Sequence, residues 1–326
     1  MTLPASPSAT RIADYLRHVA LEKRLSARTQ ALYGYELERL QKLAQQMGLE
    51  PLAASSADLR TWAARLHAQG MSARSIALTL SVWRGWYAWL GLHGLIAANP
   101  AAALRAPKKA QSLPKALAVD DAITLANYAS ERVAQCRGLA QTLALRDAAI
   151  VELLYGSGLR LGELLALDAV VTAQTEQEGR GWVDLQAAEV HVMGKGSKRR
   201  TTPVGAKSLQ ALQAYLAQRS ALLKPHQADE AALFLGARGG RLGKAALWQM
   251  LRALSLASGL PVHVHAHVLR HSFASHVLQS SGDLRAVQEL LGHANIGTTQ
   301  IYTRLDFQHL ASAYDAAHPR AKKKDD

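Results

Sequence analysis

A proline-rich, basic segment constrains the fold of this chain more than any other sequence feature. The segment NPAAALRAPKKAQSLPK covers residues 99–115 and contains three prolines and four basic side chains. Prolines at this spacing interrupt helices and central strands, so an extended, cationic linker is expected. We therefore predict a helical domain over 1–104, a linker over 105–115 and a second domain over 116–320.

The first domain has the apolar spacing of packed helices. After Ser26, apolar side chains recur at intervals of four, three, four and three residues, at Tyr33, Leu37, Leu40, Ala44 and Met47. Ser26 is a suitable N-cap and Gly48 a suitable stop for this helix. Further helices are predicted over 58–70 and 72–93. A bundle of about four helices follows.

The second domain is predicted to be mainly helical, with a small sheet. Val190 and Val192 alternate with polar residues, and the glycines at 194 and 196 provide a turn. We expect two or three short strands with a hairpin tip over 194–198, and a surface loop over 175–178. Asp120 is a suitable N-cap for the first helix. The helices are expected over 145–156, 207–222, 241–258, 266–280, 283–292 and 307–316.

The charge balance indicates a polyanionic partner. Lysine and arginine number 38 against 25 acidic residues, which gives a net charge of +13. Nucleic acid is the first expectation and an anionic membrane surface the second. The single cysteine excludes an internal disulfide and fits a reducing compartment. Because no apolar run reaches the roughly 18 residues of a membrane span, we expect a soluble, cytoplasmic protein.

Two arginine motifs are candidates for holding an anion. In GLRLGE, Arg160 lies at a predicted helix start, and Glu163 lies one turn further on, where it could orient that arginine. In HVLRH, His267 and Arg270 lie three residues apart, on one helical face. A guanidinium offers a planar fork for phosphate oxygens. Taken singly, HVLRH is equally consistent with a solvated surface, and GLRLGE is better explained by an ordinary surface pair.

Three further residues extend this set. Lys195 lies between two glycines in MGKGSKRR, where a flexible turn could bring it to a phosphate or a leaving oxygen. Lys198–Arg200 can be interpreted as a solvated basic hairpin that contacts backbone phosphates. His293 follows an amphipathic helix in LGH, and Tyr302 follows a polar segment in IY. A lone tyrosine more often serves packing.

Metal and nucleotide chemistry have weaker support. His263, His265 and His267 form H-x-H-x-H, which could present imidazoles to zinc, but no carboxylate lies between Glu230 and Asp283. A helix start with hydrogen-bonded histidines is the simpler interpretation. GGRLGK at 239–244 lacks parts of a phosphate-binding loop. We expect no metal and no cofactor.

The ordered motifs GLRLGE, MGKGSKRR, HVLRH, LGH and IY resemble those of the tyrosine recombinase (phage integrase) family over nearly the whole chain. The resemblance implies a SAM-like helical core-binding domain and an α+β catalytic domain, which together form a C-shaped clamp on DNA. It also implies a set of functional residues with Tyr302 as nucleophile: Arg160, Lys195, His267, Arg270, His293 and Tyr302. Arg304 and Ala266 depart from the family pattern, which has histidine and proline there.

The last part of the chain resembles the bacterial family members that resolve chromosome dimers at cell division. This resemblance implies a sister recombinase as partner, in a cyclic heterotetramer on double-stranded DNA, with a helix near 307–317 that docks into the neighbouring subunit. A septal DNA translocase would be a further partner, and no membrane is implied. Open alternatives are a mobile-element integrase, a type IB topoisomerase-like enzyme, a DNA-organising module and a metal phosphodiesterase.

Overall fold

The computed structural model describes residues 7–107, 116–194, 199–224, 230–291 and 318–320. The chain forms two compact units, Met1–Ser112 and Leu113–Asp326, and each is described by itself. The predicted residues Lys195, His293 and Tyr302, and the helix expected over 307–316, lie outside the described residues.

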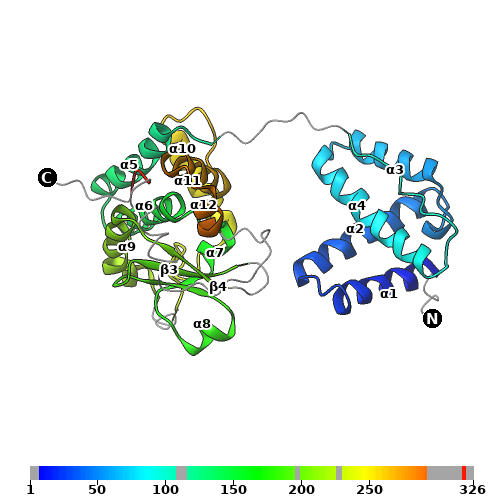
Figure 1. Cartoon of the computed structure of the whole chain (residues 1–326), viewed down its shortest axis with the longest axis horizontal. Coiled ribbons are helices and arrows are strands. Elements are labelled where there is room, and N and C mark those ends of the chain that lie inside the picture. Colours follow the sequence, from blue (N-terminus) through cyan, green and yellow to red (C-terminus); the bar gives the residue numbers. More distant parts are fainter. Residues whose placement is uncertain (1–6, 108–115, 195–198, 225–229, 292–317, 321–326) are drawn as a thin grey trace. The chain divides into compact units, whose positions relative to one another are not determined.

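The first unit is the helical bundle that the sequence predicts (Figure 1). Its described helices are α1 (Pro7–Leu21), α2 (Ala27–Gln46), α3 (Ser56–Ala68) and α4 (Ala73–Leu92), with a 3-10 turn, η1, at Pro51–Ala53. The Ser26 hydroxyl accepts a hydrogen bond from the Thr29 N–H, and Gly48 follows the helix at a φ of 67°. Both helix signals are therefore confirmed.

Aromatic side chains fill the core of this bundle. Trp62, Trp83, Trp86, Tyr15 and Tyr87 are almost completely buried. The Trp83 indole donates to the Glu36 carbonyl and the Tyr87 hydroxyl donates to the Pro51 carbonyl, so these two buried polar groups are satisfied. The bundle thus has a complete core of its own.

The second unit surrounds one buried helix. This helix, α6 (Leu139–Ser157), packs against α5 (Val119–Gln135), α9 (Ala206–Gln218) and α11 (Ala266–Ser281), as Figure 1 shows. The other described helices are α7 (Leu161–Leu165), α8 (Ala173–Gln177), η2 (Arg219–Leu222), α10 (Lys244–Ala257) and α12 (Leu284–Leu291). The α6 helix is longer than the expected 145–156, and Ala118 rather than Asp120 is the N-cap of α5.

The sheet has four described strands rather than the two or three expected. They are β1 (Leu167–Asp168), β2 (Gly181–Asp184), β3 (Glu189–Met193) and β4 (Arg199–Pro203), in that order. The β1–β2 pair is parallel, and the other two pairs are antiparallel. Because β1 has only two residues, it carries no alternation that a sequence pattern could reveal.

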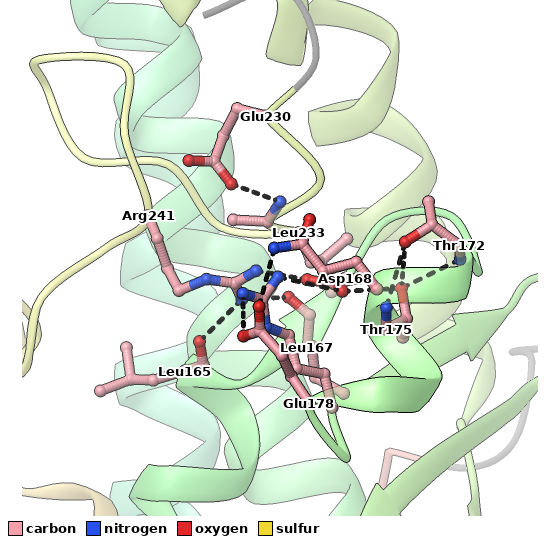
Figure 2. A network of polar contacts seen from close by, with 12 residues as sticks. Leu165, Leu167, Asp168, Thr172, Thr175, Glu178, Glu230, Leu233 and Arg241 are labelled. Carbon is pink, nitrogen blue, oxygen red and sulfur yellow. Dashed lines mark hydrogen bonds and ion pairs between the residues drawn. The ribbon is translucent and has the colours of Figure 1, made fainter.

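A buried carboxylate fixes the segment around α8 (Figure 2). Asp168 is fully buried, accepts a hydrogen bond from the Thr175 hydroxyl at 2.9 Å and forms an ion pair with Arg241. Arg241 also donates to the carbonyls of Leu165 and Leu167. The loop predicted over 175–178 is therefore wrong: part of it is helix α8, and Thr175 is buried.

Candidate active site

Arg160 is placed by the turn that ends α6. Gly158 adopts a left-handed conformation with a φ of 58°, and a Cβ there would lie 2.4 Å from Cδ1 of Phe273. Glycine is therefore required for both its backbone and its close contact with α11. Arg160 is the N-cap residue of α7, and its side chain is 37% exposed. The backbone of Arg160 is therefore fixed by the turn, while its side chain remains accessible to solvent.

Glu163 holds Arg160 in place. Its Oε2 accepts from the Arg160 backbone N–H at 2.7 Å, and its Oε1 accepts from Nη1 of the same residue at 2.7 Å. The Glu163 side chain is only 5% exposed. The orienting role that the sequence suggested for Glu163 is confirmed, and the alternative of a solvated surface pair is wrong.

Arg270 approaches the same carboxylate from α11. Its Nη1 lies 3.9 Å from Oε2 of Glu163 and donates to the Gly158 carbonyl at 2.5 Å. Its Nη2 donates to the Leu291 carbonyl, at the end of α12, at 2.6 Å. Burial, together with the charges of Arg160 and Arg200, lowers the pKa of Arg270 to about 10. The guanidinium therefore stays charged at neutral pH in a strongly positive surrounding.

Arg200 is the member of the site that the sequence interpretation missed. Its Nη2 lies 2.6 Å from Oε2 of Glu163, and its side chain is only 9% exposed. The solvated hairpin predicted over 198–200 is therefore wrong for Arg200. Alternation along the strand is the only sequence signal for the burial of Arg200, because Arg200 pairs with the buried Val192. That register is known only from the folded sheet.

His267 lies near the start of α11, at the surface. Its ring is parallel to that of His265, with 6.4 Å between the ring centroids. His267 is exposed whereas Arg270 is buried. The two side chains therefore lie in different environments, although their spacing predicted one shared helical face. The described contacts join Arg160, Arg200 and Arg270 through Glu163.

The other histidines divide between surface and core. His263, His265 and His271 are exposed, and His276 is buried. The described residues contain no group of three histidine, cysteine or acidic side chains able to hold a metal ion. None of the described helices is long and apolar enough to span a membrane.

The comparisons with known proteins cover both units. Residues 117–309 match the phage integrase family, and residues 12–94 match the phage integrase N-terminal SAM-like domain. The chain therefore belongs to the phage integrase family of tyrosine recombinases, which cleave and rejoin DNA.

Its relatives narrow the class further. It is 49% identical to tyrosine recombinase XerC 1 of Ralstonia nicotianae, over 98% of this chain and 96% of that one. It is 46% identical to tyrosine recombinase XerC of Chromobacterium violaceum, over 96% of each chain. The chain is thus a tyrosine site-specific recombinase of the XerC type.

Solved structures with the same fold hold DNA. XerH recombinase bound to its palindromic difH substrate matches with a TM-score of 0.63 at 19% identity, over 95% of this chain and 85% of that one. The Tn1549 transposon integrase in complex with circular intermediate DNA matches with a TM-score of 0.65 at 19% identity, over 93% of this chain and 98% of that one. The predicted fold class is confirmed by these likenesses and by the family matches.

Proposed function

We propose that this enzyme cuts and rejoins DNA through six residues: Arg160, Lys195, His267, Arg270, His293 and Tyr302. One observation carries the proposal. The buried carboxylate of Glu163 contacts both Arg160 and Arg270, so two guanidiniums from α7 and α11 converge at one point. An arrangement of this kind suits the nonbridging oxygens of a phosphodiester.

The arginines stabilise the charge that develops during transfer. As the Tyr302 oxygen attacks phosphorus, negative charge accumulates on the nonbridging oxygens, which Arg160 and Arg270 bind from two sides. His293 donates a further hydrogen bond to the phosphate. Loss of one such donor typically lowers the rate by about 10²–10³.

Two proton transfers complete the step. His267 accepts the phenol proton, because a tyrosine with an ordinary pKa near 10 is a weak nucleophile at neutral pH. The bond from phosphorus to the 5′ oxygen breaks, and Lys195 donates a proton to that oxygen. The products are a 3′-phosphotyrosyl enzyme and a free 5′ hydroxyl. A second 5′ hydroxyl can reverse the reaction, so strand exchange needs neither ATP nor a metal.

The biological setting follows from likeness to XerC enzymes. We place the enzyme in the cytoplasm, where it pairs with a XerD-like sister recombinase, two copies of each, to resolve chromosome dimers for segregation at cell division. The domains at 1–104 and 116–320 would clamp duplex DNA from two sides, with 105–115 as the linker. A septal DNA translocase would regulate the assembly.

Covalent capture on nicked DNA tests this function. Labelled duplex with a nick close to the cleaved phosphate traps the enzyme, because the short fragment with its 5′ hydroxyl diffuses away. We expect a protein–DNA adduct from wild type, in the presence of EDTA, and none from Tyr302→Phe. An adduct from Tyr302→Phe, or EDTA-sensitive cleavage without an adduct, would contradict the proposal.

Truncation tests the assembly. A chain that ends at Arg304 should bind one DNA site nearly as well as wild type but lose cooperative assembly in a gel shift. Truncation also removes Arg320, which forms an ion pair with the buried Glu152. Full-length Arg320→Met is therefore the control, and cooperative binding equal to wild type in the truncated chain would exclude a docking role for the tail.

A further inference from the structure

Arg200 occupies a position where a strand normally carries an apolar side chain. It pairs with Val192 across the β3–β4 ladder, and directly paired residues share one face of a sheet. Val192 is buried, whereas the neighbouring Arg199 is exposed. A guanidinium is costly to bury without partners. Arg200 therefore requires compensating partners inside the protein.

The partners of Arg200 come from two other elements of the unit. Nη2 lies 2.6 Å from Oε2 of Glu163 on α7, and Nη1 donates to the Leu290 carbonyl on α12 at 3.0 Å. Burial lowers the pKa of Arg200, and the Glu163 charge opposes that effect. One planar fork therefore connects β4, α7 and α12.

Arg270 makes the adjacent contact. It donates to the Leu291 carbonyl, the next residue of α12, and also lies beside Glu163. Two guanidiniums thus hold consecutive carbonyls in the last described turn of α12. In the sequence, His293 follows two residues after Leu291.

We propose that Arg200 is a positioning residue of the recombinase. It does not contact DNA; it fixes Glu163 and the end of α12, and so aligns Arg160 and Arg270 for the phosphate. This inference rests on the proposed function, because it concerns the same site. Lysine cannot replace Arg200, since an ammonium on a flexible stem lacks the rigid fork that reaches two partners at once.

Single-turnover kinetics test the proposal, with saturating enzyme on the nicked duplex. Arg200→Met should lower the rate of adduct formation roughly 10²-fold, the size of effect that a misplacement of about 1 Å produces. DNA affinity in a gel shift should stay within about twofold, because a buried side chain neutralises no phosphate. Arg200→Lys should remain at least about tenfold slow. A wild-type rate in either variant would overturn the proposal.

A matched variant separates positioning from stability. Arg219 is also partly buried and donates to the carbonyls of Glu230 and Ala232, and none of its described contacts involves Glu163. Arg219→Met should lower the melting temperature, as Arg200→Met does, but leave the cleavage rate of the folded enzyme unchanged. Equal slowing by both variants would mean that Arg200 acts only through general stability, against the proposal.

A double mutant tests the route through Glu163. If Arg200 acts on the arginines through this carboxylate, the combined loss in Glu163→Gln with Arg200→Met must be smaller than the product of the single losses. Losses that multiply would contradict the proposed route.

Hydrogen exchange gives a readout that needs no activity. Amides in α12 should exchange faster in Arg200→Met than in Arg219→Met, because the end of α12 loses one of its two guanidinium contacts. Unchanged exchange in α12 would overturn the proposal even if wild type formed no adduct. Absence of an adduct from wild type would instead contradict the proposed function.

Discussion

The Tyr155 hydroxyl lies 2.9 Å from Nδ1 of His276, inside the core of the catalytic unit. On the other side of the ring, Nε2 lies 2.9 Å from the Leu117 carbonyl. A carbonyl can only accept, so Nε2 carries the proton and Nδ1 accepts from the phenol. Burial lowers the pKa of His276, which favours this neutral form. The histidine therefore joins the start of the unit to α6 and α11.

Removal of the His276 ring should destabilise the catalytic unit. His276→Ala leaves a buried hydroxyl and a buried carbonyl without their partner, which should lower the free energy of unfolding by about 3 kcal/mol. His271→Ala, at an exposed position on the same helix, should change it by less than about 0.5 kcal/mol. Urea denaturation measures both, and equal effects would contradict the structural role of His276.

His267 should matter for the reaction far more than its neighbours. Loss of a general base typically costs about 10²–10⁴ in rate, so His267→Ala should slow adduct formation to that extent. His271→Ala should retain nearly full activity, and His276→Ala should lose far less than His267→Ala once compared at a temperature where it is folded. Similar losses from His267→Ala and His276→Ala would exclude His267 as the base.

Acid should destabilise the fold through His318. This ring is buried, and its Nδ1 accepts from the Arg320 N–H at 3.2 Å. Burial, together with the neighbouring His276 and Arg320, lowers the pKa of His318 from 6.5 to about 3. The unfolded chain therefore binds the proton more readily, and the stability present above pH 6.5 is lost as the pH falls toward 3.

Unfolding free energies at pH 7, 6 and 5 check this effect. The wild-type protein should lose stability over this range more steeply than His318→Asn, which cannot titrate there. Parallel pH profiles for the two proteins would show that His318 does not contribute.

Loss of the Asp168 carboxylate should lower stability strongly. Asp168→Ala leaves Arg241 and the Thr175 hydroxyl without their buried partner, and removal of one member of a buried pair costs about 3–5 kcal/mol. Glu176 is exposed on α8, the short helix that also carries Thr175, and serves as the control. Glu176→Gln should leave stability nearly unchanged. Thermal unfolding of both variants gives the comparison.

Gly158 should tolerate alanine less well than another glycine in the left-handed region. Gly158 and Gly282 both end a helix in this region, with φ of 58° and 67°, but a Cβ meets nothing within 4 Å at Gly282 and lies 2.4 Å from Phe273 at Gly158. Gly282→Ala should cost about 1–2 kcal/mol from backbone strain alone. Gly158→Ala should cost more and also slow adduct formation, because its carbonyl accepts from Arg270. An equal loss of stability in the two variants would show that the Phe273 ring moves aside without a measurable cost in free energy.

The sequence predicted the parts of the site that lie near each other along the chain. Arg160 and Glu163 are one helical turn apart, so their pairing is local and follows from spacing. The burial of Arg200 is not predictable from its basic run, because such a run is usually solvated and only strand register and the distant carbonyl of Leu290 reveal that burial. The ion pair of Asp168 is equally non-local, since its partner Arg241 lies 73 residues away.

The environment of Arg270 has a consequence for the resting enzyme. The groups whose charges act on its pKa are two other guanidiniums and a single carboxylate. Three guanidiniums and one carboxylate leave this group with two excess positive charges. If the site acts as proposed, the scissile phosphate balances part of this charge, and we expect small oxyanions such as sulfate to raise the melting temperature of the DNA-free protein.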